Sequence, residues 1–575
     1  MSAPKTPRSL LGGRRNASRG AFGQILGTRD FDPSVRSRRM PGSLTLADPT
    51  SLRAWQRLAL ERLAGWREGP FLISAAPGAG KTRPALELAK RLLAQRAVGR
   101  IAVLCPTTPL TRQWASAAAA LGVQLAPDAA GPRPPRDFAG VAVTYARVAS
   151  DPRGWAQKVT PDTLVILDEA HHLGEDLAWG TGFQQAFAAA PLRLLLSGTP
   201  FRSDATPIPG VRYDAERLAI PDVSYTYAEA VADGICRPVT FVTFDGSLSW
   251  RSGDDVIESS FETVLTAREA SRRYRTAIST ELPDGLPRIL READAKLRAL
   301  RAAGHRDAGA LAVAADATHA RRIAKLITEA TGRAPVVVLH TEARASQKLA
   351  AFRDSREPWI VAVNMVSEGV DIPRLRVGVY ATAAKTPLIF RQIVGRFVRT
   401  IPGRPPEPSW LYLPAEPVLC GHASEIEHEL RRALRDPALE LEEGLEELPE
   451  RRASEPSPQA EFVPLSAEFA PQMTLFGPAP TAAVATATAG GSTRLPAPEP
   501  APVAAFERRA DLRAERSRLV ADLHRRDGRS HREINAWLNR AVGVDRVESA
   551  TIPQLERSIA ALVKELTRRR SPAGR

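Results

Sequence analysis

The stretch AAPGAGKT, residues 75–82, decides how the rest of the chain is organised. It follows the apolar run 71–73 and opens a helical pattern of leucines and alanines, which is the strand–loop–helix setting of a phosphate-binding loop. Gly78 and Gly80 let successive backbone N–H groups point at one phosphate, and the helix N-terminus adds its positive dipole end. We expect Lys81 to reach the β- and γ-phosphates. An ordinary glycine turn before a helix is the alternative.

The loop as a whole supplies the expected nucleotide-binding set. Its members are Ala75, Gly78, Ala79, Gly80, Lys81 and Thr82. The Thr82 hydroxyl is a candidate ligand of Mg²⁺. Ala75 stands where the strict pattern has its first glycine, so the loop departs from that pattern at one position.

A second candidate site lies in LVILDEAHH, residues 164–172. An apolar strand ends here in two carboxylates, at the sheet edge where α/β proteins place ligands. We expect Asp168 to hold Mg²⁺, through water, and Glu169 to orient and deprotonate an attacking water. Two adjacent acids after a buried strand are costly unless a cation or solvent accommodates them. A solvated strand end is therefore the alternative.

The charge of the chain favours a polyanionic partner. The 575 residues have a formal net charge of +15 and are 43% hydrophobic, which is ordinary for globular domains. Residues 1–45 hold nine Lys and Arg against two Asp, and residues 506–575 hold seventeen against ten Asp and Glu. Both ends are therefore expected to hold nucleic acid, with solvated tails as the alternative.

Cysteine usage and hydropathy exclude other classes. The three cysteines lie far apart without a CxxC pair, which argues against a zinc ribbon or a disulfide framework and suits a reducing compartment. No apolar run approaches about 20 residues, so no membrane span is expected. A cytoplasmic protein is therefore expected.

Short apolar runs alternate with helical patterns twice along the chain, which predicts two successive parallel α/β domains. The predicted strands are 71–74, 101–105, 140–143, 164–167 and 192–196, then 238–244, 309–314, 335–339, 359–363 and 376–381. The predicted boundaries are a disordered basic tail over 1–45, domains over 46–220 and 221–415, a helical extension over 416–450, a disordered Pro/Ala-rich linker over 451–505 and a basic helical module over 506–575. Residues 255–302 read as mostly helical, and Ser530 is the expected N-cap of the helix that follows it.

AAPGAGKT followed by DEAH resembles the superfamily 2 helicases and translocases of the DEAD/DEAH type. The family's other motifs follow in order. LRAWQ at 52–56 resembles the adenine-recognition segment. Two segments, CPTTPLTRQW at 105–114 and VTYARV at 143–148, resemble those that grip the nucleic-acid strand. Motifs III, V and VI are resembled by LLSGTPFR at 195–202, VNMVSEGVDIP at 363–373 and RQIVGRFVR at 391–399, in that order. The resemblance covers about residues 46–415 and is strongest to the XPB-like or type III restriction-like branch. It implies two tandem RecA-like domains.

The resemblance also implies roles for single residues. Gln56 would read adenine, Gly369 would permit close backbone approach, and Asp371 would contact the ribose. Arg396 and Arg399, three apart on a predicted helix, would reach the γ-phosphate from the second domain as arginine fingers. The implied catalytic set is thus Lys81, Asp168, Glu169, Arg396 and Arg399.

Further residues would couple the nucleotide to the nucleic acid. The expected coupling residues are His171, Ser197, Thr199 and Gln392. The candidate nucleic-acid contacts are Thr107, Arg112, Thr144 and Asn364, whose side chains suit phosphate oxygens. Each of these four could instead be a helix cap or a surface residue.

Two short patterns lie outside the motor motifs. In PQMTLFG, residues 471–477, Gln472, Leu475 and Phe476 resemble the peptide by which bacterial repair and replication proteins dock on the sliding clamp; a chance apolar pattern in a linker is the alternative. Asp294 and Lys296 nominally fit a nuclease pattern, but they lie in a helical repeat, whereas that nuclease core needs a strand.

The sequence therefore predicts a DNA helicase or translocase that uses ATP and Mg²⁺, in replication-linked DNA repair or recombination. An RNA helicase, or an ATP-gated DNA-binding or defence adaptor that switches without unwinding, is the alternative. DNA and a bacterial sliding clamp are the expected partners, and these resemblances imply a bacterial cytoplasmic protein associated with the nucleoid. The oligomeric state stays open, a monomer being one option.

Overall fold

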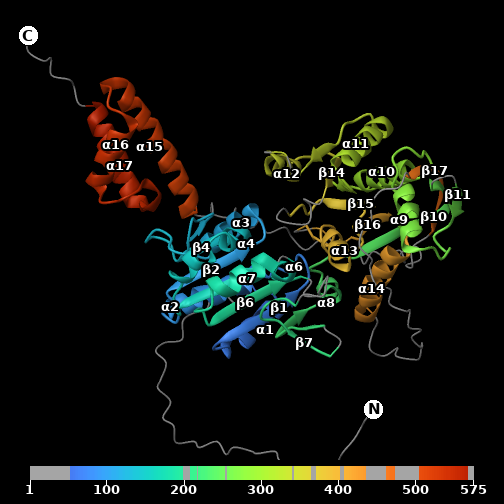
Figure 1. The fold of residues 1–575 in the computed structure, drawn as a ribbon, viewed down its shortest axis with the longest axis horizontal. Coiled ribbons are helices and arrows are strands. Elements are labelled where there is room, and N and C mark those ends of the chain that lie inside the picture. The colour runs from blue at the N-terminus through green and yellow to red at the C-terminus, as the bar shows by residue number, and fades with distance from the viewer. Residues whose placement is uncertain are drawn as a thin grey trace, which may run out of the picture. The chain divides into compact units, whose positions relative to one another are not determined.

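The computed structural model describes residues 52–175, 177–198, 207–215, 218–252, 255–339, 342, 344–363, 371–401, 404, 407–434, 462–472 and 504–567. Within them two parallel α/β domains follow one another, and a helical region ends the chain (Figure 1). The predicted fold class, two tandem RecA-like sheets followed by a C-terminal helical module, is confirmed. The tail predicted over 1–45 lies outside the described residues.

The first domain is built on a sheet with the order β3-β4-β2-β5-β6-β1-β9, in which every pair is parallel. Its strands are β1 (Gly69–Ala75), β2 (Arg100–Cys105), β3 (Leu125–Pro127), β4 (Gly140–Thr144), β5 (Thr163–Asp168), β6 (Leu192–Ser197) and β9 (Val223–Tyr225). Its helices are α1 (Ala54–Ala64), α2 (Thr82–Ala94), α3 (Thr108–Ala120), α4 (Tyr145–Ala149), α5 (Pro152–Ala156), α6 (His172–Glu175) and α7 (Leu177–Ala186). All the strands predicted for this domain are present.

Alternation along β5 sends side chains to both faces of this sheet. Ile166 belongs to a core with residues of α2 and α3, and Leu167 belongs to a separate core with residues of α4 and α7. Because both faces are covered, the strands are apolar throughout, as parallel sheets require. The carboxyl ends of β1, β5 and β6 meet at one edge, and this places Ala75, Asp168 and Ser197 near one another.

The second domain has a sheet with the order β11-β10-β16-β15-β12-β14-β13, and β17 also pairs with β10. Its strands are β10 (Val239–Ser252), β11 (Asp255–Ser259), β12 (Gly309–Ala314), β13 (Val336–Val338), β14 (Trp359–Val363), β15 (Leu375–Ala381), β16 (Ser409–Pro414) and β17 (Phe462–Gln472). Its helices are α8 (Tyr227–Ala232), α9 (Ala267–Ala277), α10 (Leu286–Ala302), α11 (Ala317–Thr331), α12 (Ala345–Arg353), α13 (Pro387–Val394) and α14 (Pro417–Leu434). A small hairpin, β7 (Arg212–Tyr213) and β8 (Ala219–Ile220), precedes β9.

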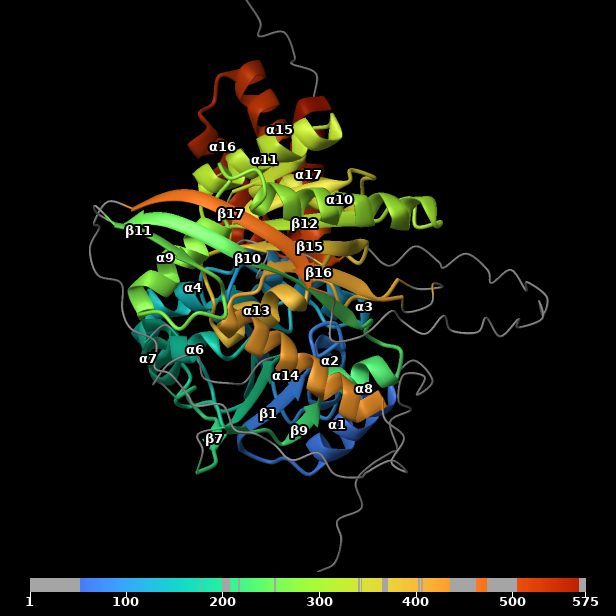
Figure 2. The same ribbon diagram turned by 90° about the vertical axis from the view of Figure 1, so that its right-hand side faces the viewer.

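The linker prediction over 451–505 is wrong for residues 462–472. These residues form β17, which runs antiparallel along β10 (Figure 2). Phe469 is buried and packs near Phe244 and Phe261, with each pair of ring centroids 6.5 Å apart. Composition alone missed the strand because its partner lies about two hundred residues earlier in the chain. The rest of the predicted linker lies outside the described residues.

Two smaller differences concern the second domain. Residues 255–259 form β11, so the region predicted as mostly helical from 255 begins with a strand. The chain enters the second domain after β9, slightly later than the predicted boundary at 220. By contrast, Asp294 and Lys296 lie on α10, as the helical repeat predicted, so the nuclease pattern is not on a strand.

The C-terminal region consists of α15 (Ala505–Asp527), α16 (His531–Val542), a short 3₁₀ turn (Val547–Ser549) and α17 (Ile552–Thr567). Ser530 caps α16 as predicted, in a capping box with Glu533. The backbone N–H of Ala505 donates to Gln124 Oε1 beside β3, at 3.1 Å. Among the described helices, none is both long and apolar enough to cross a lipid bilayer.

Candidate nucleotide site

The loop between β1 and α2 has the backbone that a phosphate cradle needs. Gly78 and Gly80 have φ of +87° and +86°, in the left-handed region where a side chain would be strained. A Cβ on Gly78 would lie 2.7 Å from Nη1 of Arg399, so the close approach of this arginine also requires glycine there. Lys81 Nζ lies 3.3 Å from the Ala75 carbonyl oxygen, which places the ammonium over the start of the loop.

Residues of the α1 start hold this loop in place. Arg53 Nη1 and Trp55 Nε1 both donate to the Ala79 carbonyl, at 2.6 and 3.2 Å. Gln56 Nε2 donates to the Gly80 carbonyl at 3.0 Å, and Gln56 Oε1 accepts from the Arg53 backbone N–H at 3.0 Å. Both ends of the Gln56 amide therefore bind the protein itself here, and adenine reading by Gln56 stays a prediction.

Asp168 ends β5 as a buried carboxylate. Its Oδ2 accepts a 2.7 Å hydrogen bond from Trp114 Nε1, and its backbone carbonyl accepts one of 2.8 Å from the Tyr145 hydroxyl. Burial raises the pKa of Asp168 above its usual range, and the neighbouring Glu169 charge raises it further; the Trp114 hydrogen bond and Lys81 oppose these effects. A carboxylate of this kind gains most from a nearby cation.

Glu169 follows in a left-handed backbone conformation, with φ of +50°. Such a φ is uncommon outside glycine, and strained residues of this kind gather at functional sites. Glu169 Oε1 lies 3.4 Å from Lys81 Nζ. Burial would raise the pKa of Glu169, but the charges of Lys81 and of the adjacent histidines outweigh burial and lower it. Glu169 is therefore ionised while Asp168 holds a proton more readily.

His171 connects three predicted motifs. Its Nδ1 lies 3.0 Å from Ser197 Oγ at the end of β6 and 3.6 Å from Glu169 Oε2. Its Nε2 lies 3.3 Å from Gln392 Nε2 on α13 of the second domain. The predicted coupling residues His171, Ser197 and Gln392 are thus in contact, whereas Thr199 lies outside the described residues.

The second domain brings arginines to the phosphate loop. One cavity is lined by Ala76, Pro77, Gly78, Gly80, Lys81, Thr82, Leu110, Gln113, Asp168, Glu169, Gly198, Asp371, Gln392, Gly395, Arg396 and Arg399. Within it, Arg399 Nε lies 3.1 Å from Asp371 Oδ1. All five predicted catalytic residues line this cavity, and both domains contribute to it. Gly369 lies outside the described residues.

The predicted nucleic-acid contacts are not gathered in the same way. Thr144 caps α4 by accepting from the Arg147 N–H at 3.2 Å, which matches the alternative of a helix cap. Arg112 is exposed and lies 3.4 Å from Asp128. Thr107 precedes α3, and its buried hydroxyl has no hydrogen-bond partner in the described part of the chain. None of these three lines the cavity, and Asn364 lies outside the described residues.

The clamp-like peptide begins where β17 ends. Gln472 is the last residue of that strand and pairs with Thr243. Leu475 and Phe476 lie outside the described residues, so their surroundings are not part of the structure described here.

Sequence reasoning missed the donors that support the site. Trp114 and Arg53 both lie in quoted motif segments, but neither was predicted to contact the nucleotide loop or the acids. A helical tryptophan facing a sheet is ordinarily read as core, and its single N–H gives no periodic signal. The position of Trp114 nine residues after the end of β2 is the only sequence hint.

Comparisons with known proteins agree with this architecture. Residues 49–202 match the family described as type III restriction enzyme, res subunit, and residues 295–400 match the helicase conserved C-terminal domain. The uncharacterized protein Rv2917 of Mycobacterium tuberculosis is 37% identical over 92% of this chain and 95% of its own length. ML1624 of Mycobacterium leprae is 41% identical over 68% of this chain and 67% of its own length.

The chain belongs to the family of Rv2917, with the two motor domains of a superfamily 2 helicase. Among solved structures, an HsdR fragment of a type I restriction enzyme from Vibrio vulnificus YJ016 is 17% identical, with a TM-score of 0.45 over 64% of this chain and 65% of that chain. Dbp5 of S. cerevisiae bound to RNA and ADP BeF3 is 15% identical, with a TM-score of 0.42 over 66% of this chain and 87% of that chain. The two family matches alone show the helicase domains of an ATPase related to restriction-enzyme motor subunits.

Proposed function

We propose that this superfamily 2 helicase couples ATP hydrolysis to movement along DNA. The observation that carries the proposal is one cavity lined by Lys81 from the first domain and Arg399 from the second. A triphosphate bound there would touch both domains, so that hydrolysis of its γ-phosphate would weaken the contact between them. Repeated closing and opening of such a cleft is a means of moving along a strand held by both domains.

The cavity residues divide the chemistry among them. Lys81 would bind the β- and γ-phosphates, Glu169 would orient and deprotonate the attacking water, and Arg396 and Arg399 would stabilise charge on the transferred phosphoryl group. The Thr82 hydroxyl and the Asp168 carboxylate offer the oxygen ligands that Mg²⁺ prefers, and both line the cavity. When bound, Mg²⁺ would neutralise phosphate charge.

His171 would report the state of the nucleotide to the second domain. It contacts Ser197 on one side and Gln392 on the other, so a change at Glu169 reaches both. The remaining predicted roles, adenine reading by Gln56 and ribose contact by Asp371, belong to the same proposal.

DNA is the favoured polyanion. The first domain matches a restriction-enzyme motor family, and the charge excess lies at the two ends of the chain. The relatives are bacterial, and the proposed action on DNA would place the protein in the bacterial cytoplasm with the nucleoid. A role in replication-linked repair rests on the clamp-like peptide. Replacing Leu475 and Phe476 with Ala should abolish binding to a purified bacterial sliding clamp; unchanged binding would remove the clamp from the proposal.

The decisive experiment compares ATP hydrolysis by the full chain without nucleic acid and with single-stranded DNA, duplex DNA, forked DNA and RNA. Stimulation by DNA above that by RNA is expected, and the Glu169→Gln variant controls for contaminating ATPases. Greater stimulation by RNA would favour an RNA helicase. Stimulation without strand separation on forked DNA would favour a translocase or a switch over an unwinding enzyme.

A further inference from the structure

Arg237 lies next to the segment that carries Arg399 and is joined to it by backbone contacts. It stands between α8 and β10, and its side chain is only 3% exposed. Its backbone N–H donates to the Val398 carbonyl at 2.8 Å, and its own carbonyl accepts from the Tyr227 hydroxyl at 2.8 Å. The preceding residue, Cys236, forms an antiparallel bridge with Arg399. The backbone of Arg237 is therefore joined to the backbone next to the arginine finger.

The Arg237 side chain contacts the segment that carries Asp371, the other member of the Arg399–Asp371 pair. Its Nη2 donates to the Pro373 carbonyl at 3.1 Å, two residues after Asp371. Asp371 Oδ1 in turn lies 3.1 Å from Arg399 Nε. One buried residue thus contacts the segments that present both the finger and the carboxylate that orients it.

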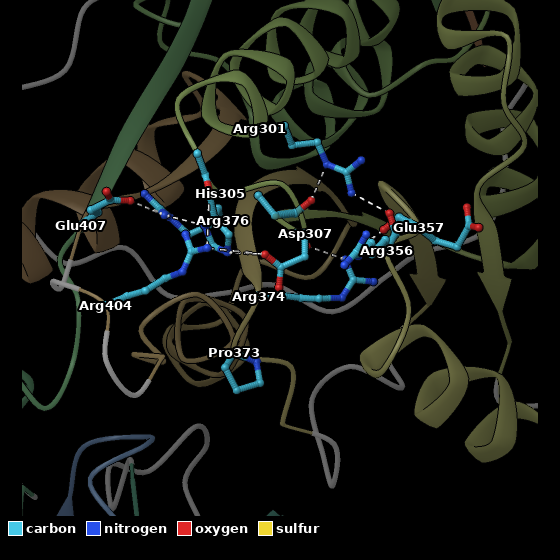
Figure 3. A network of polar contacts seen from close by, with 12 residues as sticks. Arg301, His305, Asp307, Arg356, Glu357, Pro373, Arg374, Arg376, Arg404 and Glu407 are labelled. Atoms are coloured by element: carbon cyan, nitrogen blue, oxygen red, sulfur yellow. Dashed lines mark hydrogen bonds and ion pairs between the residues drawn. The ribbon is translucent and has the colours of Figure 1, made fainter. Parts of the chain in front are cut away.

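This arrangement costs stability. Arg237 Nε and Nη1 have no hydrogen-bond partner among the described residues, although both are buried. Burial, together with the like charge of Arg376, lowers the pKa of Arg237 to about 10. The negative charge of Glu407 acts on Arg237, but this carboxylate is paired with another arginine: Arg376 Nη1 donates to Glu407 Oε2 at 2.7 Å (Figure 3). A buried and incompletely paired cation destabilises a fold.

We infer that Arg237 is a positioning residue for ATP hydrolysis, holding Pro373 so that Asp371 sets the direction of the Arg399 guanidinium. The inference rests on the proposed function, because it assumes that Arg399 acts on the transferred phosphate. An unsatisfied buried charge is retained where activity requires it, even though an apolar residue would fit the core better. Removing the Arg237 charge should therefore lower kcat but leave the melting temperature unchanged or raise it.

The test replaces Arg237 with Met in the full chain, which keeps the length of the side chain but removes its charge and its donors. The expected kcat for DNA-stimulated hydrolysis falls about tenfold or more, because a misdirected catalytic group costs that much. The KM for ATP stays near the wild-type value, and the melting temperature is unchanged or higher. Arg237→Lys, which retains a donor and a charge, should restore part of kcat without raising the melting temperature.

Arg301 provides a matched control in the same arginine network. Its Nε donates to the Ala308 carbonyl at 2.8 Å and its Nη2 to the Arg356 carbonyl at 2.7 Å (Figure 3). Among the described residues, neither of these bonds involves Asp371 or Arg399. Arg301→Met should lower the melting temperature and leave kcat near wild type. It should therefore give the reverse of the Arg237→Met result.

Two results would overturn the inference alone, with the wild type active. One is an unchanged kcat in Arg237→Met. The other is a lower kcat accompanied by a lower melting temperature, which would make Arg237 an ordinary structural residue. A wild-type chain that hydrolyses no ATP with any nucleic acid would overturn the proposed function itself and the inference with it.

Discussion

The indole N–H of Trp114 on α3 donates a 2.7 Å hydrogen bond to Oδ2 of Asp168 at the end of β5. This bond lowers the pKa of a carboxylate that burial raises. Trp114 thereby opposes the effect of burial and favours the ionised form of Asp168, which is the form that binds a metal ion. A helical tryptophan that was not predicted to contact the acids thus contributes to the electrostatics of the candidate nucleotide site.

Replacing Trp114 with Phe should weaken the use of Mg²⁺ at acidic pH. Without the indole donor, the pKa of Asp168 rises further, and protons compete with Mg²⁺ up to a higher pH. The Mg²⁺ concentration that half-saturates ATP hydrolysis should rise about tenfold at about pH 6 and much less at about pH 8, since one pKa unit is a factor of ten.

Trp155→Phe serves as the control for this measurement. Trp155 is also buried in the first domain, but it packs on Phe187, with ring centroids 5.8 Å apart, and it does not contact Asp168. An equal Mg²⁺ requirement in both variants at both pH values would show that the Trp114 hydrogen bond does not control Asp168.

Glu169→Gln should abolish hydrolysis but retain ATP binding. Lys81 lies 3.4 Å from the carboxylate, and its charge helps to lower the Glu169 pKa, so the base is ionised across the neutral range. Loss of a positioned general base costs about 10²–10⁴ in rate.

We expect Lys81→Ala, in contrast, to lose ATP affinity as well, because it removes the phosphate ligand. Single-turnover hydrolysis and equilibrium ATP binding separate the two effects, and normal turnover by Glu169→Gln would contradict the assignment of water activation.

Arg399→Ala should lower kcat strongly and leave the dissociation constant for ATP almost unchanged. An arginine finger acts mainly on the transition state and contributes about 10³–10⁵ in rate. Arg391→Ala serves as the control for position. Arg391 lies on α13, and its Nη2 donates to Glu429 Oε1 at 2.7 Å. It should lower the melting temperature and spare kcat. Equal loss of kcat in both variants would argue against a specific role for Arg399.

Much of the fold and of the site could be predicted because it depends on local patterns. Apolar runs mark β1 and β5, and the residues after them carry the phosphate loop and the acids. The contacts that complete the site come from elsewhere in the chain. Arg53 reaches the Ala79 carbonyl from α1, and Arg237 reaches Pro373 across more than a hundred residues. Such long-range hydrogen bonds leave no periodic trace in the sequence.

The same reasoning explains the strand that was missed. β17 joins the second sheet by pairing with β10, and its burial depends on that partner rather than on its own composition. Val463 and Leu465 alternate with polar neighbours only weakly, within a segment rich in Pro and Ala. Because β10 and β17 are so far apart in the sequence, their pairing cannot be predicted from the pattern of either segment alone.

Gly395→Ala should hinder closure of the cleft without unfolding the protein. Gly395 follows α13, and a Cβ there would lie 2.9 Å from the Cβ of Pro77 in the phosphate loop. That distance is too short for two carbon atoms, so the two domains could not approach as they do here. The expected result is a lower kcat and weaker ATP binding together, because both need contact across the cleft.

Gly421→Ala on α14 is the matched control, since a Cβ there meets no atom within 4 Å and alanine favours a helix by about 0.5–1 kcal/mol. It should raise the melting temperature slightly and leave hydrolysis unchanged. Wild-type hydrolysis and ATP affinity in Gly395→Ala would mean that the approach of Gly395 to Pro77 is not used in turnover.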